Sequence, residues 1–374
     1  MEILSWLIFS GFILASAVQL FIWLFYFRRL AVFSSKKNVL PNIPTEVVPV
    51  SIIICARNEA ENLKNNLPHI LNQNYRSFEV IVVDDKSEDE TRNILSKYKI
   101  TYRNLRIITV VDKPLGSGKK PALAQGIKAA NHEILLFTDA DCCPSSKEWL
   151  REMQKPIRGS MEIGLGFGPY KKSTGFLNMF IRYEAFFTAL QYFSFALAGH
   201  PYMGVGRNLI YKKELFDRAG GFVSHEHIMS GDDDLFINQV ANKNNTCIIL
   251  NENTHVYSDP VKTWSAYYRQ KNRHISTGRY YQPKHKFLLG LVSASHFFHY
   301  FLAFLLFILN FGLIFAVIII VIRILVITLI CKPILRKLQD RRLTLWTPYL
   351  DAAYVLFYVI FSISLIKGKI RQWT

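Results

Sequence analysis

Acidic side chains gather at three places in the chain, and each place adjoins an apolar run. "VVDD" ends in Asp84 and Asp85, "FTDADC" carries Asp139 and Asp141, and "SGDDDLF" carries the triplet 232–234. An Asp-x-Asp pair at the end of a strand presents carboxylate oxygens to a hard divalent cation, and substrate phosphates complete its shell. A cation held in this way neutralises charge on a departing diphosphate. Alone, the pattern is weak, because Asp is also common in turns that follow a strand.

Four apolar runs must position these acids. They read "VSIIIC", "FEVIVVDD", "LRIITVV" and "HEILLFTDAD", and helical patterns separate them over Glu59–Leu71, Glu88–Tyr98 and Pro121–Ala130. Strands that alternate with helices predict an α/β fold with a mixed, mostly parallel sheet, which binds ligands at the carboxyl ends of its strands. We expect residues 50–260 to form one such domain.

The N-terminus predicts a membrane helix. Leu4–Phe27 carries no charge and is long enough to cross a bilayer, so we expect a transmembrane helix over residues 1–29. A signal peptide is usually basic before its apolar core, whereas Arg28 and Arg29 follow it here. The positive-inside rule places this pair in the cytoplasm and the N-terminus outside. Residues 30–49 contain prolines and are expected to be a linker.

The C-terminal third also predicts membrane segments. In order, we expect a basic interfacial segment (261–286), two transmembrane helices (287–331) that turn near Asn310–Gly312, a cytoplasmic basic loop (332–342), and a membrane-associated or re-entrant segment with the C-terminal tail (343–374). Pro348 and Asp351 weaken a span in the last segment, and a crossing would leave Lys367 outside against the positive-inside rule. A crossing and a surface position both stay open.

Composition narrows the class of protein. The formal charge is +17, but no nucleic-acid-binding motif is present, and much of the basic charge lies close to apolar segments. This favours a membrane surface over nucleic acid as partner. The five cysteines have no CxxC spacing, which predicts reduced thiols in a protein that faces the cytosol. Gly175–Leu197 is aromatic but interrupted by charges, so we expect a buried or interfacial helix there.

From Val50 to His274, about 225 residues, the chain resembles the inverting family 2 glycosyltransferases and their GT-A nucleotide-sugar fold. The membrane-embedded members of this family also flank that domain with helices. The matching pieces stand in the family's order: "SIIICARNEAENL", "VIVVDDKSEDET", "GKKPALAQGIKAA", "LLFTDADC", "GRNLIYKKELFDRAGGF", "GDDDLF" and "QKNRH".

The resemblance implies a nucleotide side to the site. Arg57 and Glu59 would line the nucleotide pocket, and Asp85 would accept a hydrogen bond from the base. Lys119 matches the family's lysine near the nucleotide, and Asp139 would face the ribose or the metal.

The resemblance also implies a metal and an acceptor side. Asp141 would bind Mg²⁺ or Mn²⁺, while Gln270 and Arg273 would help to hold the acceptor side and the diphosphate. "GVGRN" contains Gly206 and Asn208, and its two glycines could let the backbone approach the donor or acceptor sugar. An ordinary tight turn is the alternative for this stretch.

The general base is one of two neighbouring acids. Counting back from Leu235 makes Asp232 the base, with Gly231 in place of the family's usual Glu. Members that read "GDD" indicate Asp233 instead. We prefer Asp232 and expect the third acid, Asp234, to cap the following helix.

These features predict a membrane-bound inverting glycosyltransferase of the bacterial inner membrane, with its catalytic domain in the cytoplasm. It would move a sugar from a nucleotide-diphosphate sugar, most simply a UDP-sugar, to a lipid or membrane-proximal glycan. A processive polysaccharide synthase and an inactive sugar-nucleotide-binding scaffold are the alternatives. His274 stands where processive synthases carry Trp, and the predicted spans are few, which both disfavour polymer synthesis.

"GSGKK" lacks the residues of a phosphate-binding P-loop. His225 and His227 lack the spacing of a helical metal site and are expected in an acceptor-side loop.

Overall fold

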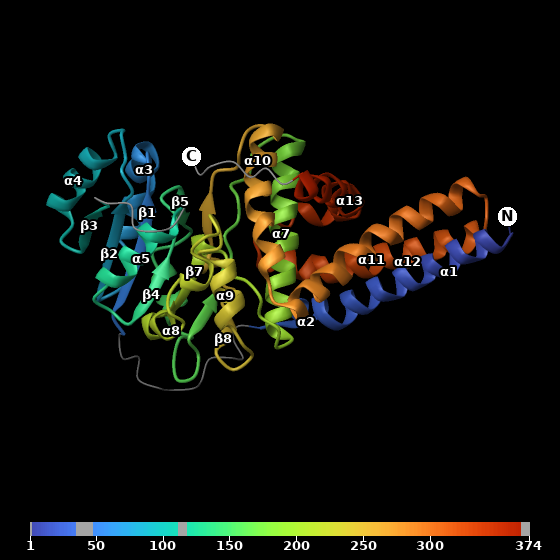
Figure 1. Ribbon diagram of the computed structural model, residues 1–374, viewed down its shortest axis with the longest axis horizontal. Coiled ribbons are helices and arrows are strands. Elements are labelled where there is room, and N and C mark those ends of the chain that lie inside the picture. Colours follow the sequence, from blue (N-terminus) through green and yellow to red (C-terminus); the bar gives the residue numbers. More distant parts are fainter. Residues whose placement is uncertain (1, 35–47, 111–117, 368–374) are drawn as a thin grey trace.

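The computed structural model describes residues 2–34, 48–110 and 118–367. Figure 1 shows an α/β domain at one end and a bundle of long helices at the other, with α7 (Phe176–Leu197) and α10 (Trp264–Ile275) between them. A linker is expected over residues 30–49, and most of it, residues 35–47, lies outside the described residues.

A seven-stranded mixed sheet forms the centre of the α/β domain. Its order is β3-β2-β1-β4-β7-β6-β8, and the first four of these strands are mutually parallel. Strand β7 is antiparallel to β4 and to β6, and β8 is parallel to β6. The predicted fold class, a mixed and mostly parallel sheet with membrane helices at both ends, is confirmed. The strands are β1 (Val50–Ala56), β2 (Phe78–Asp84), β3 (Leu105–Thr109), β4 (Ile134–Phe137), β6 (Ile163–Leu165), β7 (Leu209–Lys212) and β8 (Thr246–Ile248).

The four predicted apolar runs all form strands of this sheet because both faces of the sheet are covered. Every residue of β1 and β4 is buried, which explains why their sequences are continuously apolar. Strands β5 (Cys142–Pro144) and β9 (Val256–Ser258) pair separately beside the sheet. The helices of this domain are α3 (Ala60–Leu71), α4 (Thr91–Thr101), α5 (Lys120–Ala129), α6 (Trp149–Gln154), α8 (Lys213–Arg218) and α9 (Asp234–Val240).

Two helices separate the sheet from the membrane helices. Helix α7 (Phe176–Leu197) is largely buried and forms an aromatic layer, and α10 (Trp264–Ile275) lies beside it. A short 3-10 turn, η6 (Ser276–Tyr280), joins α10 to the next long helix. The segment expected at the headgroup level is therefore mostly helical.

The membrane part contains four helices that are long and apolar enough to cross a bilayer, counted over the residues that the structure describes. These helices indicate an integral membrane protein. The first runs over α1 (Glu2–Phe21), the π-helical turn η1 (Ile22–Phe27) and α2 (Arg28–Val32). The others are α11 (Pro283–Ile308), α12 (Leu313–Lys337) and α13 (Leu343–Lys367). Asn310 and Gly312 adopt positive φ angles in the turn between α11 and α12.

The segment between α12 and α13 is attached to the catalytic domain. Asp340 forms an ion pair with Arg182 of α7, whose Nε donates to Asp340 Oδ2 over 2.8 Å. Lys172 Nζ donates to the Gln339 carbonyl over 2.8 Å. Lys337 Nζ donates to carbonyls at the end of α2, including that of Ala31 over 2.6 Å. The basic segment thus lies on the same side of the membrane helices as the catalytic domain.

Candidate active site

One cavity of about 550 Å³ joins the sheet to the helices that border the membrane part. Arg57 and Glu59 line it beyond the end of β1, and Leu289 of α11 lines it where the long helices begin. The acids after β4 and before α9 lie between these limits. Since the carboxyl ends of parallel strands meet at one edge of a sheet, the topology itself places the cavity there.

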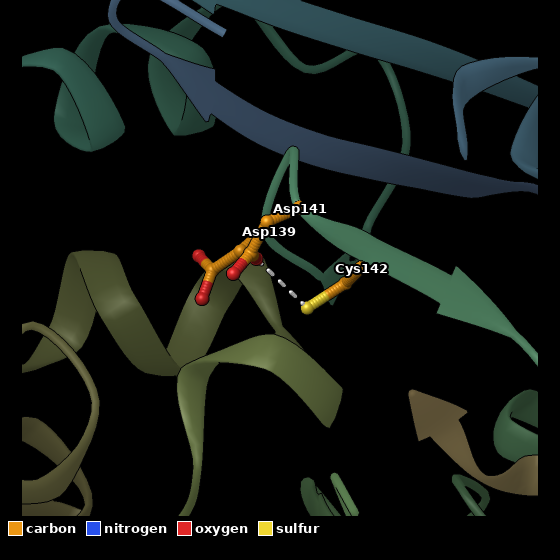
Figure 2. A group of neighbouring side chains, drawn as sticks. All are labelled: Asp139, Asp141 and Cys142. Atoms are coloured by element: carbon orange, nitrogen blue, oxygen red, sulfur yellow. Dashed lines mark hydrogen bonds between the residues drawn. The ribbon is translucent and has the colours of Figure 1, made fainter. Parts of the chain in front are cut away.

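Asp139 and Asp141 follow β4 and lie side by side (Figure 2). Each can offer an oxygen within 4.8 Å of the other and of the Cys142 sulfur. Cys142 Sγ donates to Asp141 Oδ1 over 3.2 Å. Burial, and then the charge of Asp141, raises the pKa of Cys142 well above its usual value, so the thiol stays protonated. The group therefore offers two carboxylates to a cation, which suits Mg²⁺ or Mn²⁺.

The charges around this pair set the protonation of each acid. Burial opposes ionisation of Asp139, but Lys119 forms an ion pair with it and lowers its pKa below the usual value. Burial, and then the neighbouring charge of Asp139, raises the pKa of Asp141. A divalent cation between them would remove this repulsion, because it is attracted to both charges. The residues present therefore fit a divalent metal.

Lys119 connects the metal-side acids to the candidate base. Its Nζ lies 3.8 Å from Asp232 Oδ2 while it is paired with Asp139. Burial opposes the charge on Lys119, but these acids raise its pKa well above the usual value. Its ammonium group is thus a fixed positive charge between the two acidic clusters.

Asp233 and Asp234 differ from Asp232 because their oxygens are already engaged. Asp233 Oδ2 accepts from Gly206 N over 2.6 Å, and its Oδ1 accepts from Asp234 N over 2.7 Å. Asp234 Oδ2 accepts from the Tyr281 hydroxyl over 2.7 Å. Asp233, not Asp234 as expected, caps α9 with its side chain.

The environment of Asp233 keeps its proton near neutral pH. Burial, followed by the charges of Asp232 and Asp234, raises its pKa to about 8. The two backbone N–H donors oppose this shift only in part. A protonated carboxyl cannot accept the proton of an acceptor hydroxyl, so this geometry favours Asp232 as the base.

Arg207 is a cavity residue that the sequence reasoning missed. Its guanidinium stacks on the Tyr170 ring, 4.3 Å from the ring centre, and Nη1 donates to Ser258 Oγ over 3.1 Å. Its Nε is enclosed and has no hydrogen-bond partner in the part of the chain that the structure describes. The sequence "GVGRN" offered a signal for it, because Arg207 lies between Gly206 and Asn208, which were both predicted site residues. Together with Arg273, it puts two guanidinium groups on the cavity wall.

Several predicted residues do not line the cavity. Asp85, Gln270 and Asn208 lie outside its wall, whereas the other predicted residues contribute to it. Asn208 is fully buried, accepts from Trp149 Nε1 over 3.0 Å, and donates to the Phe167 carbonyl over 2.8 Å. Through these contacts Asn208 has a structural role, because they hold the turn that carries Arg207. Gly206 lines the cavity, and its N–H donates to Asp233 Oδ2.

The helix side of the cavity carries a buried ion pair. Lys271 Nζ lies 2.5 Å from Glu184 Oε2, and both side chains are under 10% exposed. His274, which follows on α10, also lines the cavity, and burial followed by Lys271 holds its pKa well below the usual value. His274 is therefore a neutral polar group at this end.

The loop before Asp232 is held by a second lysine. Lys120 is buried, and its Nζ donates to the carbonyls of His225 over 2.6 Å and Ile228 over 2.9 Å. Burial lowers the pKa of Lys120 to about 8. His225 is buried, while no metal-ligand group is found at His225 and His227 among the described residues. The two adjacent lysines thus have different roles: Lys119 contacts the acids, and Lys120 binds the loop before Asp232.

Acids at the carboxyl edge of a mixed sheet share one cavity with Arg207 and Arg273, which is the arrangement that the resemblance to GT-A nucleotide-sugar transferases implied. Residues 51–220 match the family model "Glycosyl transferase family 2", and residues 147–331 match "Glycosyl transferase family group 2". The chain belongs to glycosyltransferase family 2 and is an enzyme of that family.

Individual relatives share only parts of the sequence. A poly-beta-1,6-N-acetyl-D-glucosamine synthase of Staphylococcus aureus (strain COL) is 32% identical over 117 residues, which are 31% of this chain and 27% of that protein. The chain thus matches about a quarter of the length of that curated relative. The mannosyltransferase PcManGT from Pyrobaculum calidifontis, in complex with GDP-Man and Mn²⁺, is 18% identical with a TM-score of 0.55 and covers 93% of this chain and 99% of that one. Residues 1–349 of S. aureus TarS, in complex with UDP-GlcNAc, are 17% identical with a TM-score of 0.44 and cover 82% and 91%.

Proposed function

We propose that this enzyme moves a sugar from a nucleotide-diphosphate sugar, most simply a UDP-sugar, to a hydroxyl of a lipid or membrane-proximal glycan, with inversion at the anomeric carbon. The observation that carries the proposal is the extent of the cavity. It runs from Arg57 and Glu59 on the sheet side, past Asp139 and Asp232, to Leu289 at the start of a membrane helix. A donor from the aqueous phase and an acceptor from the membrane can therefore meet within it.

The nucleotide side supplies charge for the diphosphate. Asp139 and Asp141 would hold a divalent cation, which when bound neutralises charge on the leaving diphosphate. Arg207 and Arg273 lie across the same cavity and bind phosphate oxygens through planar N–H donors. The mannosyltransferase PcManGT, whose fold is similar, is solved in complex with GDP-Man and Mn²⁺, which supports a nucleotide-sugar donor for this chain.

Asp232 performs the proton transfer. Its side chain is 16% exposed, and its oxygens lack the backbone donors that engage Asp233. It accepts the proton of the acceptor hydroxyl while that oxygen attacks the anomeric carbon. The attack comes from the face opposite the departing diphosphate, so a single displacement inverts the configuration.

The helix side of the site would receive the acceptor. Glu184, Thr188 and Gln191 of α7 line the cavity together with Lys271 of α10, so polar groups face an acceptor headgroup there. The basic segment 332–342 lies on the catalytic domain's side of the membrane helices, which supports a cytoplasmic catalytic domain under the positive-inside rule. The bacterial inner membrane suits this arrangement.

A donor and acceptor screen tests the proposal. The purified full chain is incubated with Mg²⁺ or Mn²⁺, with UDP-, GDP- and TDP-sugars in turn, and with lipid extracts as acceptor. We expect metal-dependent transfer to a lipid from one donor, with an inverted anomeric configuration by NMR. Retained configuration would contradict the single displacement, and sugar transfer to water-soluble acceptors alone would contradict the membrane acceptor.

The sequence match to a polysaccharide synthase supports one alternative, processive synthesis of a polymer. His274 in the cavity, where processive synthases carry a stacking Trp, disfavours it. The length of the product decides between the two. A single added sugar supports the proposed transfer, and a ladder of long products supports a synthase.

A further inference from the structure

The last helix, α13, differs in direction from the other three candidate membrane helices. Figure 1 shows α1, α11 and α12 side by side along the length of the molecule, whereas α13 is seen nearly along its own axis. It therefore crosses the bundle steeply. It also has the lowest hydropathy of the four candidate spans. If the three parallel helices cross the bilayer, a helix at a steep angle to them runs close to the plane of the membrane.

Helix α13 is fastened both to the bundle and to the walls of the active site. Asp351 accepts from Arg323 of α12 over 2.6 Å and from the Tyr300 hydroxyl of α11 over 2.8 Å. The Tyr354 ring lies 5.0 Å from that of Phe187 in α7. The stacked rings of Phe361 and Tyr268 in α10, 5.4 Å apart, hold the later part of the helix. A helix that crossed the bilayer beside α12 could not keep these contacts with both α7 and α10.

Arg323 and Asp351 are charged residues within candidate membrane helices, and their pairing explains why both charges are tolerated there. Both side chains are 1% exposed, and Arg323 Nη2 also donates to Gln19 of α1 over 3.0 Å. An unpaired charge inside a bilayer is costly, but a pair with further hydrogen bonds recovers much of that cost. The pair joins α13 to α12, and Gln19 extends the network to α1. Asp351, which weakens a span by sequence, is thus the attachment point of this helix.

The face of α13 opposite these contacts is apolar and open. Its exposed residues recur at intervals of three and four positions, which is one face of a helix. They are Leu345, Trp346, Tyr349, Leu356, Val359 and Ile360. Helices α11 and α12 also expose apolar side chains along their length. The apolar stripe of α13 needs a hydrocarbon environment along its full length.

Basic side chains lie directly before this helix. Lys332, Arg336, Arg341 and Arg342 are exposed, and Asp340 among them is paired with Arg182 of the catalytic domain. Cations at this level attract the headgroups of anionic lipids. The start of α13 is therefore fixed at the membrane surface on the catalytic domain's side.

We propose that α13 lies parallel to the plane of the bilayer instead of crossing it, with its apolar stripe in the hydrocarbon region of an anionic bilayer and both of its ends on the catalytic domain's side. It supports α7 and α10, which wall the active site, against the membrane. The proposal rests on the direction and contacts of α13, and it holds whatever donor or acceptor the enzyme uses.

Membrane depth measured along α13 tests this placement. Spin labels are attached to Leu345→Cys, Tyr349→Cys, Leu356→Cys and Ile360→Cys, one at a time, in a chain whose Cys143 and Cys247 are serine. The labelled chain is placed in phosphatidylethanolamine/phosphatidylglycerol vesicles. We expect all four labels to report nearly one depth. A spanning helix would instead produce a change of about 22 Å between the first and last labels, because each residue rises 1.5 Å.

A matched control uses a helix that we expect to span. Labels at Ile314, Ile318, Leu325 and Leu329 of α12, all exposed, should show the full depth gradient over the same number of positions. An equal gradient in α13 would overturn the proposal, and so would labels in α13 that all lie in water.

The side of the membrane reached by the C-terminus provides an independent test. An epitope tag at the C-terminus of the full chain is compared with the catalytic domain by protease digestion of inverted and right-side-out vesicles. We expect both to be digested from the same side. Digestion from opposite sides would show that α13 crosses the bilayer.

Discussion

The substitutions Asp232→Asn and Asp233→Asn separate the two candidate bases, because each keeps the size of the side chain and removes its charge. Asp232 lines the cavity, and within the described ranges 2–34, 48–110 and 118–367 no backbone N–H is found to donate to its oxygens. Loss of a general base costs about 10²–10⁴-fold in rate. This corresponds to about 3–5 kcal/mol of barrier, since each tenfold is about 1.4 kcal/mol. We expect kcat of Asp232→Asn to fall by this factor while nucleotide affinity stays within about twofold.

Asp233→Asn should behave differently. Its carboxyl has a pKa of about 8 and is mostly protonated at pH 7, so an amide resembles the native state in charge. The amide NH₂ must replace one of the two oxygens that accept from Gly206 N and Asp234 N. Losing one such buried hydrogen bond costs about 1–3 kcal/mol of stability. We expect a lower melting temperature and less than a tenfold loss of kcat.

The assay is single-turnover transfer at saturating donor, with nucleotide binding by calorimetry and unfolding by a thermal scan. Asp217→Asn, an exposed acid of α8, serves as a matched control and should change none of the three. The reasoning is refuted if Asp232→Asn keeps full activity. It is also refuted if Asp233→Asn has the larger loss of kcat without a loss of stability.

Three further predictions concern the groups around the base. Lys120→Met removes the contacts to the loop before Asp232 and should lower kcat about tenfold with nucleotide affinity retained, whereas Lys128→Met on the exposed side of α5 should change neither. Asp141→Ala should abolish Mn²⁺ binding in the presence of nucleotide, as measured by electron paramagnetic resonance, and Cys142→Ser should keep it because a hydroxyl can also donate to Asp141. His225 has a pKa of about 4, lowered by burial and then by Lys120, so the unfolded chain binds a proton below pH 6.5 that the folded chain does not. Stability should fall by up to about 3 kcal/mol between pH 6.5 and pH 4, and His225→Phe should show a smaller fall in melting temperature over that window; an equal fall in both proteins would contradict this.

The sequence predicted the sheet well because its strands carry a strong local signal. Two of the four apolar runs, "FEVIVVDD" and "HEILLFTDAD", end in acids. Strands β1 and β4 are buried at every residue, which keeps their sequences continuously apolar. The family resemblance then implied roles for Asp139, Asp141 and Lys119, and the structure places all three among the residues that line one cavity.

Contacts between distant segments could not be read in this way. Asn208 looked like a substrate residue, but its partner Trp149 lies 59 positions away and makes it structural. The place of Arg207 depends on Tyr170, whose ring lies beneath its guanidinium although the two residues are far apart in the sequence. Similarly, the cap of α9 depends on the turn conformation at Asp233, which three consecutive acids do not reveal.

The attachment of the 338–342 turn to α7 has a consequence for the choice of acceptor. Arg182 and Asp340 join the catalytic domain to the membrane helices through side chains that are at most 15% exposed, and Lys337 holds the end of α2 in the same region. The height of Asp232 above the lipid surface is therefore set by the protein rather than by a flexible hinge. For the membrane acceptor proposed above, we expect transfer to a hydroxyl whose distance from the bilayer matches that height, and less transfer to a hydroxyl on a headgroup that is one sugar longer or shorter.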